Sequence, residues 1–228
     1  MNYLAHILLS GHDQQWQLGG YLGDFIKGPL PAVDQLGVSP QGFAPPVLAA
    51  QSRSPHLLDA EGKPWSQQVL QGVVLHRRID AYTDAHEDYK RCLALLGPRF
   101  RRFAPIALDV FVDHLLALHW REYHDSSLEQ YCDDFYSFCV HRSACLPVAA
   151  AEFIARAAQY RLFSSYARWE VFEQVLSRID QRIRFDSNLV EVGFEIREHY
   201  QSLEAILLPF IATAKAYAED WRAQRALG

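Results

Sequence analysis

The chain has 228 residues, of which half are hydrophobic and 21% are charged, a composition typical of a folded globular protein with a sizeable core. Its net charge of −5 argues against a general nucleic-acid-binding protein, and no uninterrupted apolar run is long enough to cross a membrane. No lysine or arginine precedes Lys27, and the four cysteines lack CxxC spacing. We therefore expect a cytoplasmic protein with reduced thiols, without a signal peptide and without nucleic-acid or membrane partners.

Apolar residues recur at helical spacing along most of the chain, and no segment alternates like a β-strand. The predicted helices cover residues 2–10, 14–27, 69–83, 84–96, 103–121, 127–145, 147–161, 166–183 and 187–226, the last with a possible break near Pro209. Seven prolines over 29–64 predict an irregular connection with one short helix near 43–52. We expect a single all-α domain over residues 1–228, built as a helical bundle.

Two polar residues near the start of the chain have apolar neighbours. His6 interrupts the apolar stripe of residues 4–8, where a histidine is more often a satisfied core residue than a ligand. Asp24 follows three glycines over residues 19–23, and these indicate close approach of another backbone. An aspartate in such surroundings must reach solvent, a helix cap or a cation.

The helix predicted over 69–83 reads VLQGVVLHRRIDAYT and places polar residues in an otherwise apolar pattern. His76 and Asp80 are four residues apart, so they lie on one face and can converge on one divalent metal ion. The alternative is a surface His–Asp pair beside two solvated arginines, Arg77 and Arg78, because short patterns of this kind arise easily. The segment alone leaves both interpretations open.

The apolar helix predicted over 103–121 contains Asp109, Asp113 and His114. The two carboxylates lie four residues apart on one face, and burying them requires a dication or arginines from a neighbouring helix. Three arginines come just before this helix, either as a solvated surface or as a patch that docks phosphate or carboxylate groups. They are Arg99, Arg101 and Arg102.

Several residues on separate predicted helices share this combination of a ligand-type side chain and apolar surroundings. They are His6, Asp24, His76, Asp80, Asp109, Asp113 and His114. Nitrogen and oxygen donors without cysteine favour a harder divalent cation such as Mn²⁺, Mg²⁺ or Fe²⁺. Such a site favours hydrolysis, since the metal activates water and neutralises phosphoryl oxygens, and Arg77 and Arg78 would anchor a phosphate. The residues thus indicate a helical metal-dependent phosphohydrolase.

The chain also resembles the acyl carrier protein phosphodiesterase family. The resemblance rests on MNYLAHILLS at the N-terminus, LGGYLGDFIKG (18–28), GVVLHRRIDAYTDAH (72–86), RRFAPIALDVFVDHLLALHW (101–120) and SYARWE (165–170). It implies a fold distantly related to HD-type metal phosphohydrolases, although this chain reads Asp113-His114 where an HD motif reads His-Asp. It further implies Mn²⁺-dependent release of 4′-phosphopantetheine from the serine of holo-acyl carrier protein, with fatty acid biosynthesis as the setting.

From motif position and chemistry we expect the metal ligands to be His6, Asp24, His76, Asp80 and Asp113. His114 is a further candidate ligand or, like His86, a general acid, and Arg77 and Arg78 would hold the phosphate. Because acyl carrier proteins are acidic, Arg99, Arg101 and Arg102 are candidates for steering the partner. The alternatives are an HD-like phosphohydrolase of a nucleotide or another small diester, a non-catalytic helical module that binds an acidic partner, and a set of purely structural core residues.

Overall fold

The computed structural model describes residues 1–30, 57–184 and 187–226. Within these ranges the only β-pairing is an isolated bridge between Leu58 and Pro64, and the remainder is helix, turn or irregular chain, which confirms the all-α prediction. None of the helices in the described part of the chain combines the length and apolar character needed to cross a membrane. Most of the predicted 29–64 connection, including the short helix near 43–52, lies outside the described residues.

The α-helices agree with the predicted segments to within a few residues at most ends. Their bounds are α1 (Tyr3–Leu9), α2 (Gln14–Leu22), α4 (Gln67–Ala85), α5 (Glu87–Leu96), α6 (Ala104–Leu118), α7 (Leu128–Val140), α8 (Val148–Gln159), α9 (Trp169–Asp180), α10 (Leu189–Glu198) and α11 (Tyr200–Ala226). Short 3-10 turns lie between them, namely η3 (Pro98–Phe100), η4 (Trp120–Glu122), η5 (Ser143–Cys145) and η6 (Ser164–Ala167).

Local signals explain several helix ends. Asp13 accepts the backbone N–H groups of Gln15 and Trp16 at the start of α2, and Ser66 accepts that of Val69 at the start of α4. Gly97 ends α5 with a φ of 83°, a conformation that favours glycine.

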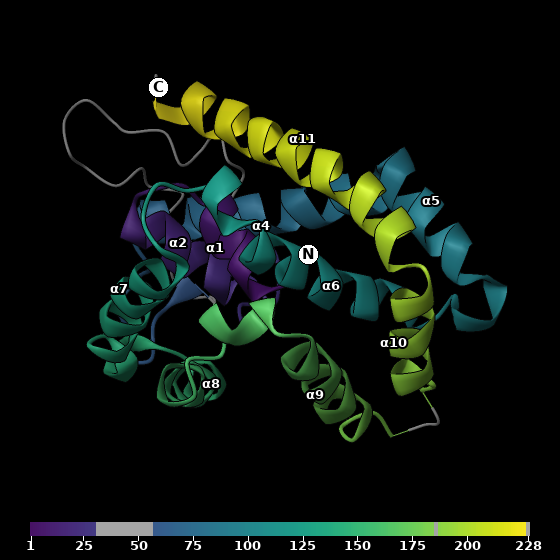
Figure 1. The fold of residues 1–228 in the computed structure, drawn as a ribbon. Coiled ribbons are helices and arrows are strands. Elements are labelled where there is room, and N and C mark those ends of the chain that lie inside the picture. The colour runs from purple at the N-terminus through teal and green to yellow at the C-terminus, as the bar shows by residue number, and fades with distance from the viewer. Residues whose placement is uncertain (31–56, 185–186, 227–228) are drawn as a thin grey trace.

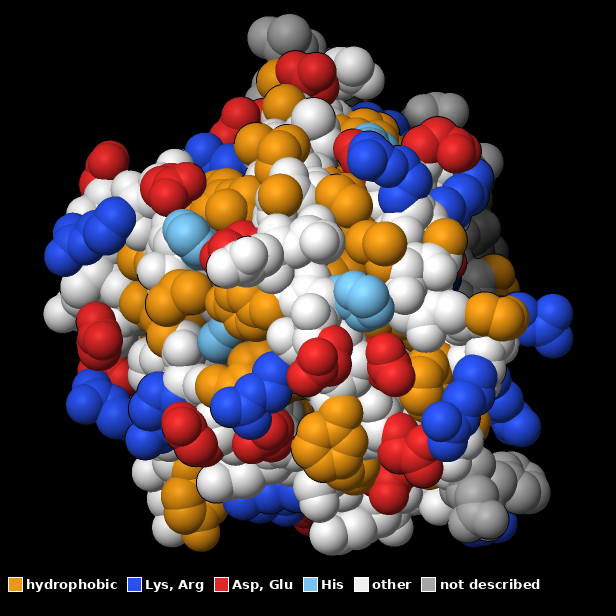
Figure 2. Space-filling model, turned by 45° about the vertical axis from the view of Figure 1, so that its right-hand side comes forward, with side chains coloured by type: hydrophobic (Ala, Val, Ile, Leu, Met, Phe, Trp, Pro, Cys, Tyr) orange, Lys and Arg blue, Asp and Glu red, His pale blue; other side chains and the backbone are white. Residues whose placement is uncertain are grey.

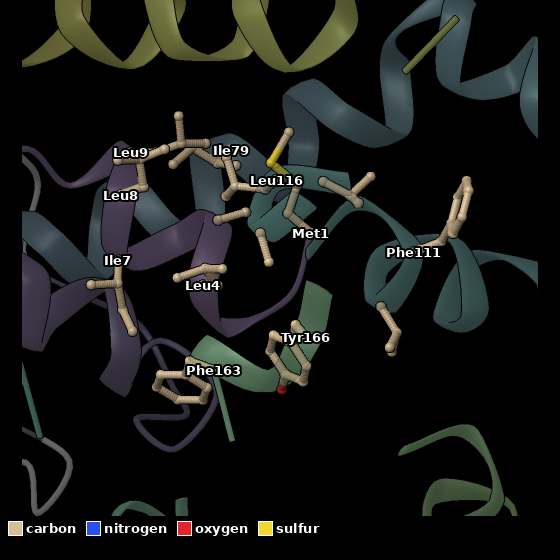
Figure 3. Close-up of a cluster of buried hydrophobic side chains, with 14 of the residues drawn as sticks. Met1, Leu4, Ile7, Leu8, Leu9, Ile79, Phe111, Leu116, Phe163 and Tyr166 are labelled. Atoms are coloured by element: carbon tan, nitrogen blue, oxygen red, sulfur yellow. The ribbon is translucent and has the colours of Figure 1, made fainter. Parts of the chain in front are cut away.

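Helix α1 lies at the centre of the molecule, against α2 and α6 (Figure 1). Helix α11 runs along one side over α4, α5 and α6, while α8 and α9 lie on the opposite side of α1. The side chains of Leu4 and Ile7 on α1 point into the core, and Met1 and Leu116 of α6 belong to the same buried cluster (Figure 3). Because every residue from Leu4 to Leu9 is buried, His6 is carried into the interior.

Helices α2 and α4 cross with their backbones in close contact. A Cβ atom at Gly19 would lie 2.7 Å from the Cα of Gly72, and one at Gly72 would lie 2.3 Å from the carbonyl oxygen of Trp16. Only glycine fits at these two positions, which confirms the close approach expected from the glycines of residues 19–23. The contact brings the end of α2 directly beside the middle of α4.

The final helical segment is interrupted at a different place from the one predicted. The break falls at His199, between α10 and α11, whereas α11 continues through Pro209. Pro209 is on the exposed side of α11, as is Ala205, whose carbonyl loses its helical partner and can instead face water. The prediction of a break near Pro209 was therefore wrong.

Candidate metal centre

Four of the predicted ligands come together where α1, the end of α2 and α4 meet. His6 lies on α1, His76 and Asp80 lie one turn apart on α4, and Asp24 follows α2. Nε2 of His6 lies 3.0 Å from Oδ1 of Asp80, and Nε2 of His76 lies 3.2 Å from Oδ2 of the same carboxylate. Oδ1 of Asp24 lies 3.8 Å from Nε2 of His76. The two imidazole rings stack with their centroids 3.7 Å apart.

The ring of His76 is held in one orientation. Its Nδ1 lies 2.8 Å from the carbonyl oxygen of Gly20, so Nδ1 carries the proton and donates. Nε2 is then the ring atom that faces Asp80, at 3.2 Å from Oδ2. Gly23 leaves room for the ring, because a Cβ there would lie 2.2 Å from Cγ of His76. A backbone acceptor on one ring nitrogen is the usual support of a histidine ligand.

The charge states of His6 and Asp80 suit metal binding. Burial and the neighbouring His76 lower the pKa of His6 to about 3, so its imidazole is neutral near pH 7. Burial raises the pKa of Asp80, but hydrogen bonds from His6 and His76 outweigh burial and hold that pKa well below its ordinary value. A neutral imidazole and an ionised carboxylate are the forms that ligate a divalent cation.

The spacing of the donor atoms fits such a cation. His6, His76 and Asp80 each offer one ligand atom within 4.8 Å of the others, and ligand atoms around a six-coordinate ion with bonds of about 2.1 Å are separated by about 3 Å. Nδ1 of His6 is buried and has no hydrogen-bond partner in the described part of the chain. The side chain of His6 is 1% exposed and that of Asp80 is 43% exposed, so the cluster is reached from the side of Asp80.

The α-amino group of Met1 also lies at the cluster, which the sequence analysis did not anticipate. It is 3.0 Å from Oδ1 of Asp109 and 3.7 Å from Oδ1 of Asp80, and the hydroxyl of Tyr89 donates to Asp109 at 2.7 Å. Burial lowers the pKa of the amine, but the two carboxylates outweigh burial and raise it overall. Asp109 stood out in the sequence only as a carboxylate in an apolar helix, and nothing marked the amine or Tyr89.

Asp113 supports α1 and stands outside this cluster. Its two carboxylate oxygens accept the backbone N–H groups of Leu4 and Ala5, each at 2.9 Å, in the first turn of α1. A carboxylate there complements the helix dipole and satisfies donors that the side chain of Asn2, the N-cap residue, leaves free. Burial raises the pKa of Asp113 to about 7, although the two backbone donors partly oppose this.

The two histidines predicted as general acids are engaged elsewhere. His114 donates from Nδ1 to the carbonyl oxygen of Tyr166 at 2.8 Å, and its Nε2 lies 3.1 Å from the hydroxyl of Tyr200. His86 is the N-cap of α5, where its Nδ1 accepts the backbone N–H of Asp88. The structure therefore brings neither imidazole into the group formed by the four converging side chains.

Arg77 and Arg78 make contacts with different parts of the chain. Arg77 donates to the carbonyl oxygens of Gly28 and Ile26, both at 2.8 Å, and so ties the chain after α2 to α4. The guanidinium of Arg78 lies over the ring of Trp221 on α11, 5.6 Å from its centroid. Successive residues on a helix diverge by about 100°, so adjacent arginines do not share a target.

The predicted partner-binding arginines lie at the turn between α5 and α6. Arg99 pairs with Glu191 of α10 and packs over Phe100, and Arg102 packs over Phe103. Arg101 is exposed. On the face shown in Figure 2, which brings the right-hand side of Figure 1 forward, acidic and basic side chains are interspersed. That face shows no broad positive patch.

Comparison with known proteins identifies a family for the chain. The family model described as acyl carrier protein phosphodiesterase matches residues 1–40 and 57–214. The chain is 27% identical to a Yersinia pestis acyl carrier protein phosphodiesterase over 96% of this chain and 98% of that protein. It is 33% identical to one from Serratia proteamaculans over 54% of this chain and 47% of that protein.

No solved structure matches the chain significantly. The family model nevertheless covers most of the sequence, and its matched residues include all four members of the cluster. The chain therefore belongs to the acyl carrier protein phosphodiesterase family.

Proposed function

We propose that this chain hydrolyses the phosphodiester between 4′-phosphopantetheine and the serine of holo-acyl carrier protein, giving apo-acyl carrier protein and 4′-phosphopantetheine. Membership of the family supports the class of reaction. The observation that carries the proposal is the convergence of His6, His76 and Asp80 beside the half-exposed Asp24, because this donor set suits a hydrolytic divalent cation.

The proposed cation is Mn²⁺, with Mg²⁺ or Fe²⁺ as alternatives, since all three accept nitrogen and oxygen ligands without sulfur. His6, His76 and Asp80 would hold it, and Asp24 would complete the site on the exposed side. Bound there, the cation would neutralise charge on the phosphoryl oxygens and lower the pKa of a water molecule.

The chain itself fixes the positions of these groups. The carbonyl oxygen of Gly20 and the missing side chain of Gly23 set the orientation of His76, so its Nε2 remains directed at Asp80. Met1 and Asp109 close the interior side of Asp80. The phosphodiester is therefore expected to approach from the exposed side, where the carboxylate of Asp24 lies 47% open to solvent.

The proposal gives no step to His86, His114, Arg77 or Arg78. The hydrogen bonds and ring contacts described above already engage these side chains. The distant relationship to HD-type phosphohydrolases also remains a proposal, because an all-α fold is common to many unrelated helical architectures.

Mass spectrometry of purified holo-acyl carrier protein tests the proposal. The carrier is incubated with this protein plus Mn²⁺, and in parallel with EDTA. We expect loss of the phosphopantetheine mass with Mn²⁺ only, no loss with His76→Ala, and normal loss with His141→Ala. His141 is a suitable control because it is exposed and bonds to its own helix, at Ser137.

Three outcomes would contradict the proposal in different ways. Cleavage that persists in EDTA would show that the reaction does not require the proposed metal ion. Metal-dependent turnover of a small phosphodiester such as bis(p-nitrophenyl) phosphate, without cleavage of the carrier, would replace the substrate. Binding of the carrier without any hydrolysis and without bound metal would indicate a non-catalytic binding module.

A further inference from the structure

A broad groove runs between α8 and α9 and ends at the start of α1, on the lower side of the molecule in Figure 1. Its volume is about 1010 Å³, at the upper end of the range for small-molecule sites. The base of the groove is apolar and consists of partly buried side chains packed on the main core. They are Tyr3, Phe25, Phe153, Leu162, Val175 and Ile179.

Basic residues surround this apolar base. Arg156 of α8 and Arg178 and Arg182 at the end of α9 line the groove, against a single acidic residue, Glu152. Arg156 approaches Glu152 only to 3.9 Å, and no residue in the described ranges forms an ion pair with Arg178 or Arg182. The lining is thus positive although the whole chain carries a net charge of −5.

The inner end of the groove lies next to the metal centre. Asn2 and Phe25 both line it, and their chain neighbours are Met1, whose amine is 3.7 Å from Asp80, and Asp24. Tyr3, which also lines the groove, is influenced by charges from both regions. Burial raises the pKa of its hydroxyl, the charge of Asp24 raises that pKa further, and the charge of Arg182 lowers it. The inner end of the groove is therefore formed by the chain neighbours of Met1 and Asp24, while the four cluster side chains themselves lie outside its lining.

We propose that the α8–α9 groove is the docking surface for the acidic carrier protein, whose apolar side chains cover the groove base and whose carboxylates pair with Arg156, Arg178 and Arg182. An apolar centre with a charged rim is the usual anatomy of a protein interface, and charge complementarity mainly raises the rate of encounter. The inference rests on the proposed function and adds the surface on which the substrate protein binds. The arginines at the α5–α6 turn are the rival surface.

Kinetics with holo-acyl carrier protein at low ionic strength test this docking surface. In Arg178→Glu/Arg182→Glu we expect KM for the carrier to rise by about tenfold or more, with kcat changed less than about threefold and with the difference shrinking as salt is added. Turnover of bis(p-nitrophenyl) phosphate should be unchanged. Lys90→Glu/Arg91→Glu on α5 makes the same charge change at exposed positions and should leave KM unchanged.

Titration of apo-acyl carrier protein by calorimetry gives a second readout that does not need hydrolysis. Weaker binding by the groove variant than by the α5 control would support the docking surface even if the parent protein did not cleave the carrier. An unchanged KM and an unchanged affinity in the groove variant would overturn the proposal while the proposed function stood. An increase in KM confined to Arg101→Glu/Arg102→Glu would transfer the docking surface to the α5–α6 turn. A parent protein that neither cleaves nor binds the carrier would overturn both.

Discussion

Replacing Gly23 by alanine tests how closely the backbone after α2 controls the metal centre. Gly23 has φ −53° and ψ −35°, which any residue adopts, so the backbone itself does not require glycine. Alanine at a helical position is favoured over glycine by up to about 1 kcal/mol. On backbone grounds alone, Gly23→Ala should therefore stabilise the protein.

The contact with His76 predicts the opposite. The new Cβ would lie 2.2 Å from Cγ and 2.3 Å from Cδ2 of the ring, whereas ordinary contacts begin at 3.4 Å, so the ring must move by about 1 Å or more. That movement disturbs both the 2.8 Å bond to Gly20 and the 3.2 Å approach to Asp80. We expect about 1–3 kcal/mol of destabilisation from overpacking and a loss of about 10–100-fold in metal affinity.

Calorimetric titration with Mn²⁺, urea unfolding and kcat/KM for the carrier measure these effects on one sample. Gly193→Ala on α10 is the matched control, because its Cβ would meet the terminal Cδ1 of Leu176 at 3.0 Å and Cε1 of Phe172 at an ordinary 4.0 Å. The control should bind Mn²⁺ normally. A Gly23→Ala protein that is as stable as the parent and binds Mn²⁺ with the same affinity would refute the reasoning.

Three further predictions concern the stability of the protein. Asp113→Asn replaces one acceptor at the start of α1 with a donor and should lower the free energy of unfolding by about 2–4 kcal/mol, as measured by urea denaturation. The hydrogen bond with Glu204 raises the pKa of His119. This pair therefore adds stability below about pH 6.5, and that stability is lost as the pH rises through the folded-state pKa. Glu204→Gln should reduce this pH-dependent part of the free energy of unfolding, by less than about 1 kcal/mol. Mn²⁺ at about 100 times its Kd should stabilise the parent by about 2.7 kcal/mol in thermal unfolding but leave His76→Ala unchanged.

The helical architecture was predictable because the sequence carries its signals locally. Apolar spacing, the serine before α4 and the Gly97-Pro98 stop are all readable without tertiary information. The break at His199 carries no glycine or proline. The break instead reflects that α10 and α11 pack their buried faces against different sets of helices. These contacts are visible only in the assembled core.

The candidate site was predictable where its residues share one helix or one surrounding pattern. The sequence indicates His76 and Asp80 through their four-residue spacing and His6 and Asp24 through their apolar contexts, and the structure brings these four side chains together. Asp113 looked equivalent in the sequence, since a buried carboxylate needs partners of some kind. Its partners are backbone N–H groups more than 100 residues away, and such donors leave no trace in the amino-acid pattern.

Anomalous diffraction from crystals grown with Mn²⁺ tests the central claim most directly, because it locates the ion without reference to activity. The account predicts one strong anomalous peak within ligand distance of Nε2 of His6, Nε2 of His76 and the carboxylate of Asp80, absent from crystals of His76→Ala. A peak at another place in the molecule, or none at a Mn²⁺ concentration that saturates activity, would contradict the assignment of these residues as the metal centre.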